Sequence, residues 1–169
     1  TPARVAVVCD YPEEGWPSMD LTGAMVLDHL ARNHAGGFTP ERVCPPYRRR
    51  AARLPVVGGR GTARNVDRLL NRFHDYPRAL ARVAAEGRFD LYHLVDHSYA
   101  QLVHALPPGR AVVTCHDLDT FRCLLDPARE PRPKWFRAMT RRTLDGLRQA
   151  AAVTCDSEAT RAGLLAHTI

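Results

Sequence analysis

The sequence lacks the features that mark several common classes of protein. It has no CxxC pair, which argues against a zinc ribbon and against a thioredoxin-type motif. It has no apolar run near the roughly 20 residues that cross a bilayer, and no charged-then-apolar leader follows Thr1. Its five cysteines are an odd number, and three of them lie in apolar runs, where cysteine acts as a small hydrophobe. We therefore expect a reducing, cytosolic compartment.

Lysine is almost absent, although the chain is basic. Lys134 is the only lysine among 24 basic residues, and the formal net charge is +6. Positive charge favours anionic partners such as nucleotide phosphates or anionic lipid. Codon bias explains an arginine-rich and alanine-rich composition equally well. The basic residues are spread over several elements and form no recognised nucleic-acid-binding module, so we expect no nucleic-acid partner.

The glycine fingerprints of nucleotide-binding loops are missing as well. The stretch "CDYPEEGWPSMD" has neither GxGxxG nor GxxxxGK[ST], and its single Gly15 is flanked by Glu13, Glu14 and Trp16. A pyrophosphate would meet two carboxylates there, which argues against NAD, FAD or ATP as a ligand of this loop. No GxSxG elbow of an α/β-hydrolase is present. We interpret Trp16 as a stacking platform for a flat or sugar-like group, the alternative being a Trp that covers the core of its own loop.

What the chain does contain is a regular alternation of strand-like and helix-like segments. Short, nearly continuous apolar runs predict four buried parallel strands: Arg4–Asp10, Phe89–Val95, Arg110–His116 and Ala151–Ser157. The stretch "FTPERVCPP" is a weaker fifth candidate, and its prolines predict an edge strand or a strand with a bent end.

Helical patterns lie between these runs. The predicted helices are Asp20–Asn33, Thr62–Glu86, Ser98–Leu106, Lys134–Gln149 and Ser157–His167. We expect Asp20, Ser98 and Ser157 to cap three of them, and Pro77 to divide the second into two helices. The arginine- and glycine-rich stretch Pro45–Arg64 is predicted to be a loop. The alternation predicts an α/β fold: a Rossmann-like, doubly wound parallel sheet in three α/β/α layers.

Polar side chains follow the apolar part of each predicted strand. In open parallel sheets, ligands bind beyond the carboxyl ends of the strands, so the stretches "CDYPEEGWPSMD", "VDHSY", "CHDLDTFR" and "CDSEATR" are expected to meet in one crevice. Asp96 and His97 lie just before a predicted helix, where the dipole favours a neutral His97 and where Asp96 is alternatively an auxiliary cap. His116 is the strongest candidate for chemistry, the alternative being a histidine bonded to a carboxylate for structural reasons.

A metal site is a weaker interpretation of the same residues. His93, His97, His116 and Asp117 are ligand types, and His93 and His97 are four apart, which suits two ligands on a helix face. This segment is predicted to be a strand, so the two histidines are separated by an extended distance. We therefore expect no metal and no cofactor.

Together these stretches resemble a known family. "RAVVTCHDLDTFR", then a helix, then "AAAVTCDSEATRAGLL" is similar to the amino-terminal half of a family 4 glycosyltransferase of the GT-B type. "FDLYHLVDHSYAQLVHALP" and "RVAVVCDYPEEGWPSMDLTGAMVLDHL" resemble the preceding strands and helices of that family. The resemblance implies that residues 1–169 are the acceptor-binding half of a two-domain enzyme. The carboxyl-terminal half, which would hold most of a nucleotide-sugar donor, is then absent from this chain.

The resemblance also implies roles for individual residues. His116 would face the transferred sugar as the catalytic residue, and Gly15 and Trp16 would lie near the acceptor and the donor phosphates. Asp96, His97 and Asp117 would bind substrate. The family transfers a hexose to an acceptor hydroxyl with retention of configuration, commonly by front-face transfer and without a metal. Asp119 is assigned a structural role.

Two further expectations remain open. The alternative function is a stand-alone α/β domain that binds a sugar or an anion without catalysis; an epimerase is disfavoured by the missing glycine fingerprint. Lys134, Arg137, Arg141 and Arg148 project to one side of a predicted helix, and with Arg48–Arg50 they could touch an anionic membrane. The alternative is a solvated basic face. We expect a cytoplasmic protein, either free or peripheral at the inner membrane face.

Overall fold

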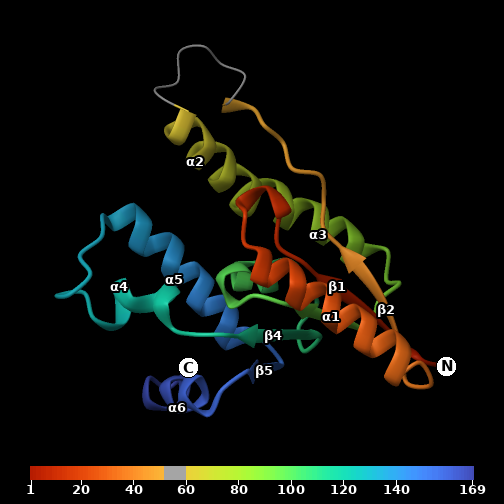
Figure 1. The fold of residues 1–169 in the computed structure, drawn as a ribbon. Coiled ribbons are helices and arrows are strands. Elements are labelled where there is room, and N and C mark those ends of the chain that lie inside the picture. Colours follow the sequence, from red (N-terminus) through yellow and green to blue (C-terminus); the bar gives the residue numbers. More distant parts are fainter. Residues whose placement is uncertain (52–59) are drawn as a thin grey trace.

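The computed structural model describes residues 1–51 and 60–169 and contains one parallel sheet (Figure 1). The five strands lie in the order β2-β1-β3-β4-β5, and every neighbouring pair is parallel. Their bounds are β1 Ala3–Val8, β2 Phe38–Val43, β3 Leu91–Leu94, β4 Ala111–Cys115 and β5 Ala152–Cys155. The predicted strands are all present. Each is shorter than expected, and Asp10, His116 and Asp156, which the prediction placed within three of the strands, belong to the following loops.

The strand order makes the sheet doubly wound. From β1 the chain moves outward to β2 at one edge, then returns to β3 on the other side of β1 and continues to β5. The order therefore reverses between β1 and β3, and open α/β sheets bind ligands at that switch point. The predicted Rossmann-like α/β/α fold is confirmed, and it is consistent with one half of a GT-B architecture.

Helices cover both faces of the sheet because alternate residues of the central strands point to opposite sides. Val5, Val7 and Cys9 form one core cluster with apolar side chains of α1, Pro17–Asn33. Ala6 and Val8 belong to the larger cluster on the other face. That cluster includes side chains of α3 (Tyr76–Ala85), of the 3-10 helix η4 (His97–Ala105) and of α5 (Lys134–Gln149).

The two edge strands of the sheet are β2 and β5, and both are largely exposed or half-buried. β2 is an edge strand, as its prolines predicted. β5 forms the other edge, and its residues alternate between exposed and half-buried, so the prediction of a strand covered on both faces is wrong there. The following helix α6, Glu158–Ala166, places Leu164 in the larger core cluster.

The second predicted helix is interrupted, but not by a break at Pro77. α2 (Arg60–Leu70) runs into a π-helical turn, η3 (Asn71–Asp75), and then into α3 (Figure 1). Pro77 lies in the first turn of α3, directly after the π-helical turn, which takes the place of the break that we expected at this proline. α2 begins at Arg60, so the end of the predicted loop Pro45–Arg64 is helical; positions 52–59 lie outside the described residues.

Capping differs from the prediction at two of three helices. α1 begins at Pro17 after Trp16, which leaves Asp20 in the first turn rather than at the cap. Asp96 caps η4 by accepting a hydrogen bond from the Ser98 N–H, so Ser98 is not the cap. Ser157 caps α6 through the Thr160 N–H, as predicted, and Glu158 lies in the first turn.

The predicted apolar face of α5 packs inward. Phe136 and Met139 are half-buried, and Thr143, Leu144 and Leu147 are buried. The remaining short elements are η1 (Pro12–Glu14), η5 (Asp119–Phe121) and α4 (Arg122–Leu125), which follow β1 and β4. Among the described residues, none of the helices has the length and the apolar character needed to cross a membrane.

Candidate active site

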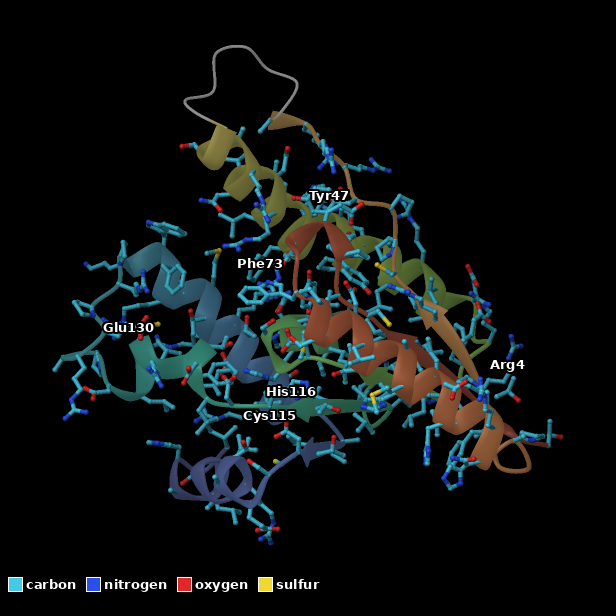
Figure 2. All side chains as sticks on the ribbon, viewed as in Figure 1. Arg4, Tyr47, Phe73, Cys115, His116 and Glu130 are labelled. Atoms are coloured by element: carbon cyan, nitrogen blue, oxygen red, sulfur yellow. The ribbon has the colours of Figure 1, made fainter. Side chains whose placement is uncertain are left out.

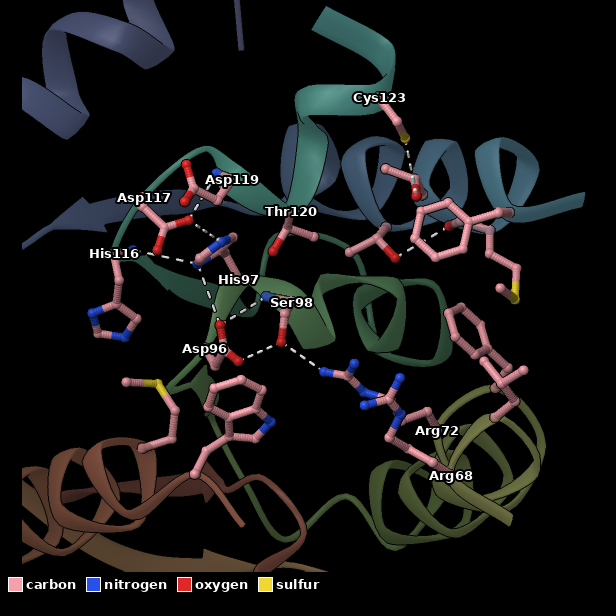
Figure 3. Close-up of a pocket in the computed structure, with 18 of the residues that line it drawn as sticks. Arg68, Arg72, Asp96, His97, Ser98, His116, Asp117, Asp119, Thr120 and Cys123 are labelled. Atoms are coloured by element: carbon pink, nitrogen blue, oxygen red, sulfur yellow. Dashed lines mark hydrogen bonds and ion pairs between the residues drawn. The ribbon is translucent and has the colours of Figure 1, made fainter. Parts of the chain in front are cut away.

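A pocket of about 470 Å³ lies beyond the carboxyl ends of β1, β3 and β4 (Figure 3). Its walls come from the start of α1, from α2 and η3, from the segments after β3 and β4, and from α5. The reversal of strand order between β1 and β3 opens this space, since the helices on the two sides diverge there. The volume is in the range of small-molecule sites.

Five of the six residues predicted to act at a site line this pocket: Trp16, Asp96, His97, His116 and Asp117. Gly15 is not among the lining residues. It adopts a left-handed conformation, with φ of 77°, directly before Trp16 and so sets the direction in which Trp16 enters the pocket. The structure therefore brings together the tips of three strands, as the sequence predicted.

The fourth tip reaches the pocket only indirectly. Asp156, which follows β5, does not line it but bonds to His116 from behind. The Thr160 hydroxyl also donates to the His116 carbonyl over 2.8 Å. The segment after β5 therefore positions His116 rather than contributing its own side chains to the pocket.

His116 follows the end of β4 (Figure 2), and both of its ring nitrogens have acceptors. Nε2 lies 2.8 Å from the Val95 carbonyl and Nδ1 lies 2.9 Å from the Asp156 carboxylate. A carbonyl accepts only, and a carboxylate is best served by an N–H, so the geometry favours the doubly protonated imidazolium. Burial alone would lower the pKa of His116, but the bonds to Asp156 and Val95 outweigh it and raise the pKa above its ordinary value. The side chain is 16% exposed.

His97 lies beside His116 but is the neutral member of the pair. Its side chain is 4% exposed, and burial is the main reason that its pKa is lowered, with the positive His116 and Arg72 adding to the effect. The sequence predicted a neutral His97 from the helix dipole, whereas burial is the larger cause. Nδ1 accepts from the His116 backbone N–H over 3.3 Å, which leaves the proton on Nε2, 3.5 Å from Asp117.

Asp96 and Asp10 form a buried acidic pair beneath the pocket. Burial, together with the neighbouring Asp96 carboxylate, raises the pKa of Asp10 to about 9, so Asp10 holds a proton at neutral pH. Burial also acts against an ionised Asp96, but the hydrogen bonds from Ser98 and from the protonated Asp10 lower the pKa of Asp96 below its ordinary value. Asp96 is thus the ionised member, and it is the one that lines the pocket.

Trp16 is 55% exposed and lines the pocket, which favours an indole that faces a ligand over one that only covers the core of its own loop. The side chains around the rest of the pocket are mixed. Apolar lining comes from Met19, Leu69, Phe73, Phe136 and Met139. The strand-end side of the pocket is polar, with Ser98, Asp117, Asp119 and Thr120 beside the two histidines. Such a pocket suits a ligand with both hydroxyl groups and apolar surface.

Asp117 and Asp119 differ in their local bonds. Asp117 accepts from the Asp119 N–H over 2.8 Å, and its second oxygen has no bond in any of the described contacts. Asp119 pairs with Arg122 at 2.6 Å, which supports the structural role assigned to it, although it too lines the pocket.

A network that was not predicted from the sequence holds the pocket from the α2 side. Arg72 donates to the Ser98 hydroxyl over 2.6 Å, and that hydroxyl in turn donates to Asp96. The Arg72 guanidinium lies 4.0 Å above the Tyr99 ring and 3.5 Å from the Glu14 carboxylate. Arg68 and Arg72 both line the pocket; their i, i+4 spacing in "DRLLNRF" was the available signal.

Glu14 corrects one argument from the sequence. It is buried and accepts from the Tyr99 hydroxyl over 2.9 Å, so it faces inward and not toward a ligand of the loop. Only Glu13 of the two carboxylates is exposed. The loop still has no glycine fingerprint, but repulsion by two carboxylates is no longer a reason to exclude a phosphate there.

A metal-ligand cluster is not formed by the histidines considered above. The His93 Nε2 lies 2.8 Å from the Thr114 hydroxyl. No group of three or more His, Cys, Asp or Glu side chains gathers at metal-binding distance within residues 1–51 and 60–169.

A doubly wound sheet with a pocket at its switch point is typical of α/β domains that bind small molecules. The chain belongs to Glycosyltransferase Family 4, whose family model matches residues 23–168. No curated protein and no solved structure matches the chain. The matched span contains every lining residue of the pocket except Trp16, Ser18 and Met19. The protein is therefore a glycosyltransferase domain.

Proposed function

We propose that residues 1–169 are the acceptor-binding half of a retaining glycosyltransferase. The enzyme would transfer a hexose from a nucleotide-sugar to an acceptor hydroxyl. The observation that carries this proposal is the convergence of Trp16, His97, His116 and Asp117 on one pocket at the strand ends, within a chain of this family.

The polar side of the pocket would bind the acceptor. The unbonded carboxylate oxygen of Asp117 can accept a hydrogen bond from a sugar hydroxyl, and so can the Ser98 hydroxyl oxygen, whose own proton is donated to Asp96. The buried Nε2–H of neutral His97 lies 3.5 Å from Asp117 and helps to orient that carboxylate. The exposed Trp16 indole offers a face on which a pyranose ring can stack. Orienting one hydroxyl toward the anomeric carbon is the main contribution of such a half-site.

His116 would act through charge and not as a base. An imidazolium whose two N–H groups are already bonded has no lone pair for a proton. A fixed cation near the reaction centre favours the negative charge that develops on the departing phosphate. In front-face transfer, that phosphate oxygen takes the proton of the acceptor hydroxyl, so no protein base is needed.

The donor would be held chiefly by a second α/β domain. Gly15 and Trp16 would lie near the donor phosphates where the two halves meet. We also propose that the reaction needs no metal and no cofactor, because the cation at His116 can carry part of the charge stabilisation that a metal would supply.

A second candidate has one observation in its favour. Both ring nitrogens of His116 are occupied, which is also what a purely structural histidine would show. The domain would then bind a sugar or an anion without catalysing transfer. The two candidates differ in whether turnover depends on His116.

Contact with an anionic membrane stays a prediction. Lys134, Arg141 and Arg148 are exposed along α5, whereas Arg137 is half-buried. Arg50 is paired with Asp75 at 2.5 Å, so it adds less free charge than its place in the sequence implied. Cosedimentation with vesicles of anionic and of neutral lipid would test this prediction and the proposed location at the inner face of the cytoplasmic membrane.

A donor and acceptor screen with the complete gene product that contains residues 1–169 tests the proposed function. We expect transfer of a hexose with retained configuration at the anomeric carbon, which NMR of the product would show. We also expect transfer to persist in the presence of a metal chelator. Residues 1–169 alone should transfer no sugar. Inverted product, or full transfer by residues 1–169 alone, would contradict the proposal.

A further inference from the structure

We propose that Arg68 and Arg72 form a subsite for a phosphate group carried by the acceptor. This inference rests on the proposed function, because it names a chemical property of the molecule that the pocket would bind. It depends on a guanidinium without a partner, on a second one that is held in place, and on where both lie in the pocket.

Arg68 lines the pocket without an internal partner. No hydrogen bond or ion pair joins its guanidinium to any residue in the described part of the chain, and its Nε is buried and unbonded. The sequence of positions 52–59, "ARLPVVGG", contains no acidic residue that could neutralise it. Arg68 is half-buried as a residue and has no counter-ion among the described residues, so its guanidinium is available to an anion that enters the pocket.

Arg72, four residues along the same helical run, is held in place. The Ser98 hydroxyl accepts from it over 2.6 Å, Glu14 lies 3.5 Å from its Nε, and the Tyr99 ring lies 4.0 Å beneath it. These contacts fix the guanidinium before a ligand arrives, which lowers the entropy cost of binding.

The two cations face the same pocket. Residues four apart on a helix are neighbours, and like charges at that spacing repel. Glu14 offsets part of the charge on Arg72, but nothing in the described structure offsets Arg68. A phosphate dianion matches this arrangement because it supplies two negative charges and three acceptor oxygens to two guanidinium groups.

The position of the pair favours the acceptor over the donor as the source of that phosphate. Figure 3 shows the guanidinium groups of Arg68 and Arg72 across the pocket from His116. If His116 faces the reaction centre, the leaving phosphate is near His116. The Arg68–Arg72 side would then receive a part of the acceptor remote from the reacting hydroxyl.

The test measures ligand binding to residues 1–169 by calorimetry and by NMR of the arginine Nε–H signals. The probes are glucose 6-phosphate, glucose, inorganic phosphate and UDP. Arg68→Gln removes the proposed cation, and Arg68→Lys keeps the charge but not the planar fork. Arg82→Gln is the matched control, because Arg82 is an exposed arginine of α3 that does not line the pocket. Thermal unfolding of each variant shows that it is folded.

We expect glucose 6-phosphate to bind at least about tenfold more tightly than glucose, because its phosphate adds charged hydrogen bonds that glucose cannot make. Inorganic phosphate should compete with it and shift the Arg68 signal. Arg68→Gln should abolish the preference, Arg68→Lys should retain part of it, and Arg82→Gln should leave it unchanged.

Three results would overturn the inference: glucose 6-phosphate that binds no better than glucose, an Arg68→Gln variant that keeps the preference, or Arg68-dependent binding of UDP without that of glucose 6-phosphate. The outcome is separable from the proposed function. A complete protein without transferase activity would leave a positive binding result standing, and loss of the phosphate preference would leave transfer to a neutral acceptor intact.

Discussion

His97 and His116 lie with ring centroids 6.2 Å apart, yet their surroundings favour opposite protonation states. His97 is buried and its Nδ1 accepts a backbone N–H, while His116 places both nitrogens against acceptors. Two positive charges at this distance in a partly dry pocket would repel, so a neutral His97 favours a cationic His116. The pair therefore places one fixed charge beside a neutral ring in the wall of the pocket.

The hydrogen bonds of His116 to Asp156 and Val95 favour its charged form, so we expect its pKa to lie above 6.5 in the folded domain. Its bond to Asp156 is the largest favourable cause, so Asp156→Asn should lower that pKa. A raised pKa also means that His116 stabilises the fold fully below its unfolded pKa, and that this contribution is lost as the pH rises through the folded pKa. NMR titration of the ring signals measures the shift. A His116 pKa below 6.5, or one indifferent to Asp156→Asn, would contradict the assignment.

Asp10 also makes the stability of the fold depend on pH, but its pKa is raised because burial and the Asp96 carboxylate disfavour its charged form. Its carboxyl keeps its proton in the folded state up to a pKa of about 9, whereas the unfolded chain releases it near 3.8. The fold is therefore penalised increasingly as the pH rises between those values. Asp10→Asn cannot ionise, so its stability relative to the native protein should increase with pH. Urea unfolding at about pH 5 and about pH 8 measures the difference. A difference that does not change with pH would show that Asp10 is ionised in the folded state.

At the scale of single residues, the sequence indicated which side chains would meet but not how they bond. Trp16, His97, His116 and Asp117 follow apolar runs, and the rule for parallel sheets places them together. The partners of His116 could not be predicted, because Val95 and Asp156 are 21 and 40 residues away and their contact depends on strand register. The roles of Arg68 and Arg72 could not be predicted, because charged residues on a helix are usually solvated.

Among the elements, α5 and η4 pack with their backbones close together at Gly146 and Ala100. A Cβ at Gly146 would lie 2.0 Å from the Ala100 carbonyl oxygen, and backbone cannot yield as a side chain can. η4 carries Asp96, His97 and Ser98 at its start, so this contact supports one side of the pocket.

Gly146→Ala is therefore expected to destabilise the domain by about 3 kcal/mol, since overpacking forces the two elements apart. Gly61→Ala in α2 is the control, because a Cβ at that position would have nothing within 4 Å and alanine favours a helix by roughly 0.5–1 kcal/mol. Urea unfolding of both variants gives the comparison. Equal stability of Gly146→Ala and the native protein would mean that η4 and α5 are not in close contact.

The elements themselves were largely predictable, and their ends were not. Runs of apolar residues identified four of the strands, the weaker candidate "FTPERVCPP" became β2, and the 3.6-residue pattern identified the buried face of α5. The cap of η4 moved from Ser98 to Asp96, and the kink expected at Pro77 became a π-helical turn before it. Both depend on local hydrogen bonds that several neighbouring residues could supply, so the sequence leaves the choice open.

At the scale of the whole molecule, the strand order is what places the pocket. Alternation of strands and helices predicted a doubly wound sheet, and the order β2-β1-β3-β4-β5 puts the reversal at the central strands. The same order moves β5 to an edge, which is why Asp156 supports His116 from behind instead of facing the pocket. Membership of Glycosyltransferase Family 4 agrees with this architecture.

The central claim is that the pocket at the strand ends, with His116 as its fixed cation, is where sugar transfer occurs. The most direct measurement is the turnover of the complete protein with His116→Ala, beside His167→Ala, an exposed histidine outside that pocket, as the control. We predict that His116→Ala lowers kcat about 10²-fold or more while the domain stays folded, and that His167→Ala leaves kcat unchanged. Near-normal turnover by a folded His116→Ala protein would contradict the account.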